Sequence, residues 1–343
     1  MRKATRLFAL LSTAPLLIFA QTSPQAPTIV ALQNNYSYTL PFAPNYGIAQ
    51  GSIFIIRGTN LAPGSTSLQS YPLPTLLLGV TLSVSINNVV THPYLYYVTP
   101  GQIAAILPSA TPVGNATLTV NNSGQMASAT IQVVQSAFGI LTLNGGGTGP
   151  AAVFDASANP LTPVSAATPG ATITLWGSGA GPVTGDESKL QTPTNLANIP
   201  MEVDIGGISA TVSYHGRSIY AGVDQINVVV PPTVQPGCWV SVVVRNGASI
   251  GNFATIPVAA AGQTACSDAV TGYTGAQLQS FYSKGTFNVG SIAIGSYNVP
   301  PQNNVRPLIP AETQSRKQIC QIWLSGRANV QPNPLADNLG NLV

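Results

Sequence analysis

The stretch GSIFIIRGTNLAPG, residues 51–64, has a counterpart 119 positions later, GATITLWGSGAGPVTG at residues 170–185. Each copy begins with a glycine, continues with apolar residues and reaches a second glycine, Gly58 or Gly177, where we expect the strand to end in a sharp turn. Further along, after four added residues, Gln102-Ile103 matches Gln225-Ile226 at an offset of 123. A repeat that keeps its spacing across loops predicts two copies of one fold.

Each copy is predicted to be built from short strands. In the first, Ile53 and Ile55 alternate with Phe54 and Ile56, so both faces of the strand are apolar, as in the core of a sandwich. Runs rich in Val, Ile and Thr recur between the 33 glycines and 29 prolines of the chain. This pattern is typical of an all-β fold, and each copy has about the size of an immunoglobulin-like β-sandwich.

The fold class that we expect is therefore all-β, with two immunoglobulin-like β-sandwiches in tandem and a small β-rich C-terminal segment that contains one short helix. Thr274 is suited to cap that helix, which would run through Lys284 and stop at Gly285. The expected organisation is a signal peptide at 1–20, a first β-sandwich at 27–135, a linker hairpin at 136–168, a second β-sandwich at 169–261 and the C-terminal segment at 262–343.

The C-terminal segment is expected to place the side chains of Leu278, Phe281 and Tyr282 on one face of its helix. Strands are expected at 286–297 and 317–324. Either this last domain is small, or the chain is truncated there.

The start of the chain predicts export. Arg2, Lys3 and Arg6 precede an apolar run from Leu7 to Ala20, which is too short to span a bilayer, and we expect cleavage after Ala20. Without these three basic residues, the 12 basic residues of the chain fall to nine and equal the nine acidic ones. A neutral chain with scattered basic residues is a poor ligand for nucleic acid, and no later run is long enough to span a membrane.

The cysteines are Cys238, Cys266 and Cys320. Export favours a disulfide. Cys238 begins a strand and Cys266 follows the last strand of the second copy, while a bond from Cys266 to Cys320 would instead hold the tail; one thiol is left over in either arrangement. With no Cys-x-x-Cys and only two histidines, the sequence predicts no metal site and no cofactor.

The sequence predicts no catalytic residue. Ser178 does not belong to a nucleophile elbow, because no G-x-S-x-G occurs. The only clustered acids are Asp186, Glu187, Glu202 and Asp204, and alternation places the last two on a solvated strand face. An enzyme acting on polysaccharide would need two of these acids about 5–10 Å apart in a cleft.

Aromatic side chains are the best candidates for ligand binding. Tyr94, Tyr96 and Tyr97 form a cluster in the first copy, and Tyr214 and Tyr220 flank the equivalent loop of the second. Exposed aromatic rings can stack on sugar rings, and the same rings can fill the space between sandwich ends. The amides of Gln102 and Gln225 are expected to satisfy loop backbone groups.

The motifs GSIFIIRGTNLAP and YVTPGQIAAILP of the first copy, with GSGAGPVTG and YHGRSIYAGVDQINVVVP of the second, resemble a family of uncharacterised secreted proteins of Solibacter-type acidobacteria. The resemblance covers roughly residues 27–295. The G-T-N-L turn is also similar to IPT/TIG modules of cell-surface proteins. The resemblance implies export and a β-sandwich fold, favours pairing of Cys238 with Cys266, and supplies no activity or catalytic residue.

Together these observations predict a secreted or cell-surface, non-catalytic protein of a bacterium that acts as a scaffold, adhesion or glycan-binding module. Its expected partner is an extracellular glycan or a cell-surface protein. The alternatives are an accessory region of a polysaccharide-acting enzyme, or a weak enzyme of that kind, and a self-assembling surface layer.

Overall fold

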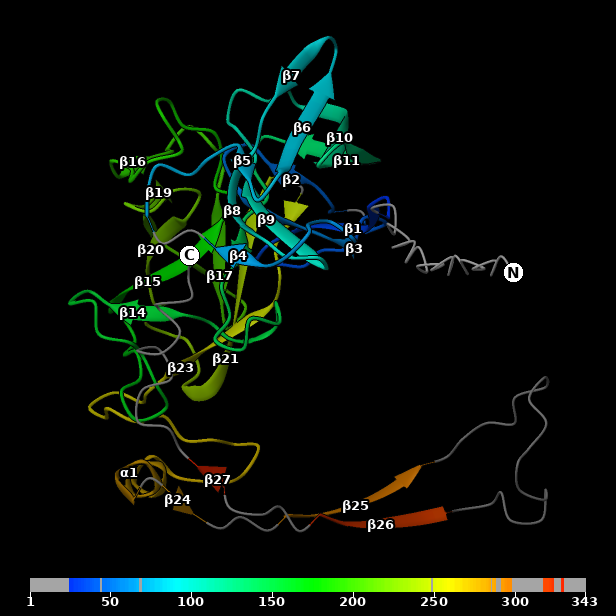
Figure 1. Cartoon of the computed structure of the whole chain (residues 1–343). Helices are drawn as coiled ribbons and strands as arrows, with labels where there is room; N and C mark the ends of the chain where they lie inside the picture. The colour runs from blue at the N-terminus through cyan, green and yellow to red at the C-terminus, as the bar shows by residue number, and fades with distance from the viewer. Residues whose placement is uncertain are drawn as a thin grey trace, which may run out of the picture.

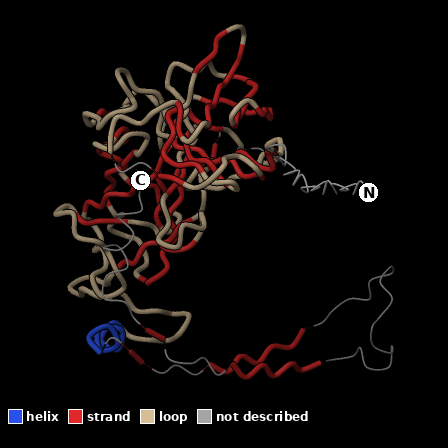
Figure 2. The backbone as a smooth tube through the Cα atoms, viewed as in Figure 1, coloured by secondary structure: helices blue, strands red, loops and turns tan. Residues whose placement is uncertain are grey.

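Two β-sandwiches make up most of the computed structural model, the first blue to green and the second green to yellow in Figure 1. The structure describes residues 25–43, 45–67, 70–247 and 249–284, and the backbone of four later strands. Within these ranges strands and loops dominate, with one helix (Figure 2). The predicted all-β, immunoglobulin-like tandem fold is confirmed. The expected signal peptide, residues 1–20, lies outside the described residues.

The first sandwich has two sheets, whose strands are mostly antiparallel. One sheet has the order β1 (Thr28–Asn34), β3 (Ile53–Thr59), β9 (Gln102–Ile106), β8 (Tyr94–Val98) and β4 (Thr66–Ser67). The other has the order β2 (Ile48–Ala49), β11 (Gln125–Val134), β10 (Gly114–Asn122), β6 (Val80–Ile86) and β5 (Leu76–Leu77), with β7 (Val89–Thr91) on β6.

The second sandwich repeats this plan. Its first sheet has the order β12 (Gly139–Ile140), β15 (Thr172–Ser178), β20 (Asp224–Val229), β19 (Val212–Arg217) and β16 (Thr194–Asn195), with β14 (Val153–Asp155) on β15. Its second sheet has the order β13 (Gly149–Pro150), β23 (Ala254–Val258), β21 (Gly237–Asn246), β17 (Glu202–Ile205) and β18 (Ile208–Ala210), with β22 (Ser249–Ile250) on β21.

Strand β3 is apolar on both faces because each face packs against a different cluster. Phe54 and Ile56 point into the core between the two sheets of the first sandwich. Ile53 and Ile55 point the other way, into a separate apolar cluster where the two sandwiches meet. All four are buried, and full burial of such a side chain stabilises a fold by roughly 1.5–3 kcal/mol. One strand therefore serves two packing interfaces.

The expected linker at 136–168 is wrong, because this segment belongs to the second sandwich. Strands β12 and β14 pair with β15, and β13 pairs in parallel with β23. The two arms bridge each other at Thr142 and Ala151, as a hairpin would. The first sandwich has the same arrangement, since β2 pairs in parallel with β11. In both copies the segment before the repeated stretch therefore contributes strands to both sheets. The glycine-rich composition of residues 136–168 did not predict these strands.

Gly58 and Gly177 have a different role from the one expected. Both lie inside strands rather than at turns. A Cβ on Gly58 would lie 1.8 Å from the carbonyl oxygen of Thr28, and one on Gly177 would lie 2.2 Å from that of Gly139. Glycine is therefore required because a backbone carbonyl of the paired leading strand, β1 or β12, occupies the space that a side chain would need.

The C-terminal helix α1, Gly275–Lys284, occupies the predicted residues. The backbone amide of Gln277 donates to Thr274 Oγ1 at 3.4 Å, and the Thr274 amide donates to Gln277 Oε1 at 2.9 Å, which is a capping box. None of its side chains is buried. Beyond it, β25 (Ser291–Tyr297) pairs with β26 (Lys317–Trp323), and β24 (Thr286–Phe287) with β27 (Ala328–Asn329). Gly285 lies outside the described residues.

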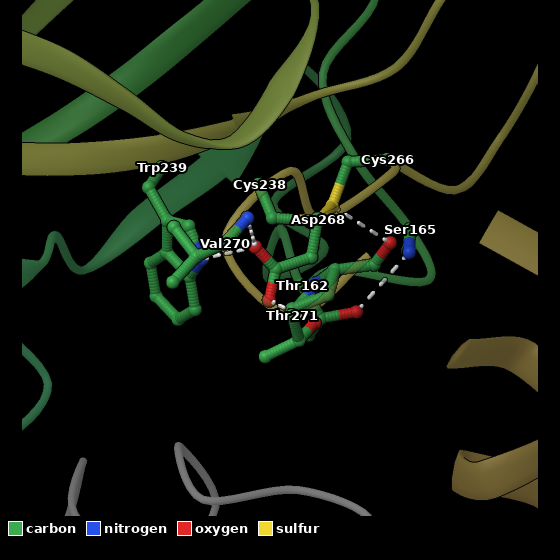
Figure 3. The surroundings of a disulfide bond; sticks show 9 residues. Thr162, Ser165, Cys238, Trp239, Cys266, Asp268, Val270 and Thr271 are labelled. Carbon is green, nitrogen blue, oxygen red and sulfur yellow. Dashed lines mark hydrogen bonds between the residues drawn. A yellow bond between two sulfur atoms is a disulfide. The ribbon is translucent and has the colours of Figure 1, made fainter. Parts of the chain in front are cut away.

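A disulfide joins Cys238, on β21, to Cys266, with the two Cα atoms 5.2 Å apart (Figure 3). This is the pairing that the family resemblance favoured. Next to it, Asp268 accepts hydrogen bonds from Trp239 Nε1 at 3.0 Å and from Thr271 Oγ1 at 2.7 Å. The Cys238–Cys266 disulfide and the Asp268 carboxylate together attach the turn that precedes α1 to the second sandwich.

We expect Cys238→Ala to lower the free energy of unfolding by about 3–4 kcal/mol, because the covalent loop no longer restricts the unfolded chain. Urea unfolding followed by circular dichroism measures this loss. The matched control is the double variant Cys238→Ala/Cys266→Ala, which should lose no more than the single variant. A single variant as stable as the wild type would contradict the prediction.

Candidate functional site

The two sandwiches meet across an apolar cluster, which we call the junction. Strands β3, β8 and β9 contribute from the first sandwich, and the loop between β19 and β20, residues 218–223, contributes from the second. The buried members of the junction are Tyr36, Ile53, Ile55, Leu73, Tyr96, Ala104, Ile106, Ala221 and Val223. The sandwiches are thus packed as a core is packed, rather than joined by a loose linker.

A buried ion pair lies at the edge of the junction. Arg217 ends β19 and Asp224 begins β20, both are fully buried, and Arg217 Nε lies 2.9 Å from Asp224 Oδ1. Asp224 Oδ2 also accepts the backbone amides of Gly179 at 2.7 Å and Ala180 at 2.8 Å. Arg217 Nη2 donates to the carbonyl oxygen of Gly51 at 2.8 Å, across the junction. A buried charge needs such partners, so the pair ties the loop base to the first sandwich.

Gly51, the first residue of the repeated stretch, makes room for this arginine. Its φ is +71°, and a Cβ there would lie 2.7 Å from Arg217 Nη2 and 3.0 Å from Glu187 Oε1. Its counterpart Gly170 has a φ of +83° and has open space where a Cβ would be. Both positions need glycine for the turn, and only Gly51 also needs it for the junction.

Glu187 forms a second polar contact between the sandwiches. Its Oε2 accepts the Ser109 amide and its Oε1 accepts the Ser109 hydroxyl, both at 2.7 Å. Burial raises the pKa of Glu187, while the hydrogen bonds from Ser109 and the charge of Arg217 oppose the rise. The side chain is 5% exposed. This acid therefore links the two sandwiches through Ser109.

Ser178, the last residue of β15, forms a third polar bridge between the sandwiches. Its hydroxyl accepts the Ile53 amide at 2.8 Å and donates to the carbonyl oxygen of Gly222 at 2.6 Å. Asn34 Nδ2 donates to the Ser178 carbonyl at 3.1 Å. With its proton donated and an amide accepted, the hydroxyl links the second sandwich to β3 of the first.

Beside the junction, the outer face of the sheet that contains β14, β15 and β20 is hollowed into a groove of about 490 Å³. Three rings line it. The Trp176 ring lies 6.3 Å from that of Phe154, edge to face, and 6.1 Å from that of Tyr220. The volume is within the range of ligand pockets, roughly 300–1,000 Å³.

Polar side chains lie among these rings. Gln225 is paired with Trp176 across β15 and β20, and within the described ranges its amide has no hydrogen-bond partner. Thr174 donates to Asn227 Oδ1 at 3.1 Å. Asp155 accepts bonds from the side chain and amide of Asn159 and the amide of Ser157, which lower its pKa. The lining contains no basic residue, and its one carboxylate already has partners.

The five predicted tyrosines are placed in different ways. Tyr96 is 2% exposed, and its hydroxyl donates to the carbonyl oxygen of Ala221, so it packs between the sandwiches. Tyr94 and Tyr97 are half-buried against the junction. Tyr214 donates to the Arg217 carbonyl at 2.6 Å, and Tyr220 alone lines the groove.

Trp176 and Phe154 were not predicted. Their signal was nonetheless present, because alternation in ITLWG places Trp176 opposite the buried residues Ile173 and Leu175, on the outer face of the sheet. The expectation for the glutamines is also wrong. Gln102 Nε2 donates to the hydroxyl of Tyr97, and Gln225 lines the groove, so neither amide satisfies a loop backbone group.

The clustered acids have separate environments. Asp204 pairs with Arg245 at 2.7 Å and Glu202 is exposed, both on β17. Asp186 pairs with Lys189 at 2.8 Å on the surface, beside the buried Glu187. Within the described ranges no three His, Cys, Asp or Glu side chains gather as a metal site. No helix in that part of the chain is long and apolar enough to cross a membrane.

No protein-family model and no curated protein matches the chain. Similar solved structures include the plexin A4 extracellular region, with 14% identity over 70% of this chain and 19% of that chain, and a TM-score of 0.21. Another is SGBP-B of the Bacteroides ovatus mixed-linkage glucan utilization locus in complex with a heptasaccharide, with 11% identity, 64% and 46% coverage, and a TM-score of 0.27. The I9–I11 tandem of titin has 13% identity, 69% and 67% coverage, and a TM-score of 0.21. The chain covers less than half the length of the plexin A4 and SGBP-B chains.

We expect Gly51→Ala to destabilise the protein by more than Gly170→Ala. Both variants carry a cost of about 1–2 kcal/mol for a side chain at positive φ. Gly51→Ala should lose at least about 1 kcal/mol more, because Arg217 must move from the Gly51 carbonyl. Chemical unfolding of the two variants in parallel measures the difference, and equal losses would contradict the role assigned to Gly51.

The raised pKa of Glu187 predicts a dependence of stability on pH. Between the ordinary value, 4.5, and the raised one, the folded chain binds more protons than the unfolded chain, so stability falls as pH rises through this window. Glu187→Gln does not titrate there. The unfolding free energy of this variant, minus that of the wild type, should therefore increase from about pH 4 to pH 7.

The control for this measurement is Asp186→Asn. Hydrogen bonds from Lys189 and Ser188 lower the pKa of Asp186 to about 2, so the wild type keeps that contribution at higher pH and loses it in acid. The unfolding free energy of this variant, minus that of the wild type, should therefore fall mainly between about pH 2 and pH 4 and change little from pH 4 to pH 7. The same difference for Glu187→Gln at both pH values would refute the prediction.

Proposed function

We propose that this protein is an exported, non-catalytic β-sandwich protein that binds a neutral glycan in the groove of its second sandwich. The observation that carries the proposal is that the rings of Phe154, Trp176 and Tyr220 line one groove with the amide of Gln225, which has no hydrogen-bond partner among the described residues.

The chemistry of the groove fits a sugar chain. Aromatic rings offer apolar area to the C–H faces of sugar rings, and a free amide can both donate to and accept from hydroxyl groups. The lack of a basic side chain in the lining, with Asp155 already bonded, favours a neutral sugar over an acidic one. Few and separated polar groups in a mostly apolar pocket are typical of specific small-ligand sites.

Export is part of the proposal. It is supported by the basic and apolar start of the chain and by the Cys238–Cys266 bond, since disulfides persist in oxidising compartments. The packed junction further favours a scaffold that presents the groove at a fixed orientation. An accessory region of a polysaccharide-acting enzyme would use the same groove in the same way.

We expect Trp176→Ala to weaken glycan binding at least about tenfold, because an aromatic face of this size contributes roughly 1.5–3 kcal/mol. The probes are the hexasaccharides of cellulose, xylan, chitin and amylose, with an oligogalacturonate as the acidic comparison. Isothermal titration calorimetry on the full chain measures affinity.

Trp239→Ala is the matched control, because Trp239 is 48% exposed and lies outside the groove. It should bind as the wild type does. No binding of any neutral hexasaccharide by the wild type, or an equal loss in both tryptophan variants, would refute the proposed function.

A further inference from the structure

The loop between β19 and β20 lines the groove with one side and packs against the first sandwich with the other. Ile219 and Tyr220 are 48% and 40% exposed and line the groove. Ala221 and Gly222 are buried against the first sandwich. Four consecutive residues therefore link the proposed ligand site to the junction.

Hydrogen bonds on both sides hold this loop in place. The Tyr96 hydroxyl, from β8 of the first sandwich, donates to the carbonyl oxygen of Ala221. The Ser178 hydroxyl donates to the next carbonyl, that of Gly222, while it accepts the Ile53 amide of β3. At the loop base, Arg217 binds both Asp224 and the Gly51 carbonyl.

The loop backbone also touches the first sandwich directly. Gly222 has a φ of +68°, and a Cβ there would lie 2.7 Å from Ile53 Cγ1 and 2.9 Å from Ile106 Cγ1. Both isoleucines are buried in the junction. No side chain fits between loop and sheet, so the position of the loop depends on the docked first sandwich.

From this geometry we infer that the groove is a composite site, in which the first sandwich sets the ligand affinity without contacting the ligand. Tyr96 is a positioning residue that holds Tyr220 and Ile219 in their binding positions through Ala221. The inference rests on the proposed function of the groove. Coupling of this kind is reciprocal, so bound ligand must stabilise the junction by the same factor.

The test uses the full chain and the neutral hexasaccharides named above. Tyr96→Phe keeps the ring and removes its hydroxyl, which donates to the Ala221 carbonyl and also interacts with the Tyr71 side chain of its own sandwich. It should weaken binding about fivefold, as the loss of one hydrogen bond to the loop does. Gly222→Ala displaces the loop and should weaken binding at least about tenfold. Tyr97→Phe is the matched control and should leave affinity unchanged, since the Tyr97 hydroxyl contacts Gln102 of its own sandwich.

Hydrogen exchange supplies a readout that a purely structural role would not change. In the wild type, bound hexasaccharide should slow exchange of the Ile53 amide, which lies across the junction and outside the groove lining. In Tyr96→Phe this protection should shrink together with the affinity, while in Tyr97→Phe it should persist.

The outcomes separate the two proposals. If the wild type binds and Trp176→Ala does not, but Tyr96→Phe and Gly222→Ala keep the wild-type affinity, the composite site is refuted and the glycan site stands. If bound hexasaccharide leaves hydrogen exchange of the Ile53 amide unchanged, the composite site is also refuted. If the wild type binds none of the sugars, both proposals fail.

Discussion

A buried guanidinium is the constraint on which the arrangement of the two sandwiches depends. Arg217 has no access to solvent, so removing its partners would leave an uncompensated charge in an apolar surrounding. Asp224 supplies the counter-charge from the same sandwich, and the Gly51 carbonyl supplies an acceptor from the other. The Arg217 guanidinium gains its acceptor from the first sandwich only when the sandwiches are docked, which favours one relative orientation over others that would bury similar apolar area.

The two copies of the repeat differ on the outer face of one sheet, the sheet that contains β3 and β9 in the first copy and β15 and β20 in the second. Arg57 and Gln102 are paired across β3 and β9, as Trp176 and Gln225 are across β15 and β20. In the first copy the arginine stacks on Tyr38 and the glutamine bonds to Tyr97, so the protein itself occupies this face. In the second copy the same positions line an open groove.

Local patterns were sufficient to predict the sandwiches and α1, because alternation in strands and the Thr274 cap act within a few residues. The junction could not be predicted in this way. Tyr96, Arg217 and Glu187 find their partners about 80–170 residues away, and nothing local distinguishes them from surface residues. The mistaken linker at 136–168 has the same origin, since its parallel pairing with β23 spans a similar separation.

The covalent bond between Cys238 and Cys266 also changes how the protein carries mechanical load. Tension applied to the chain beyond Cys266 passes through the sulfur atoms to the start of β21. Residues 239–265 then form a closed loop that bears no pull, and this loop contains β23, which pairs in parallel with β13 outside the loop. Under such tension β23 would be shielded from force.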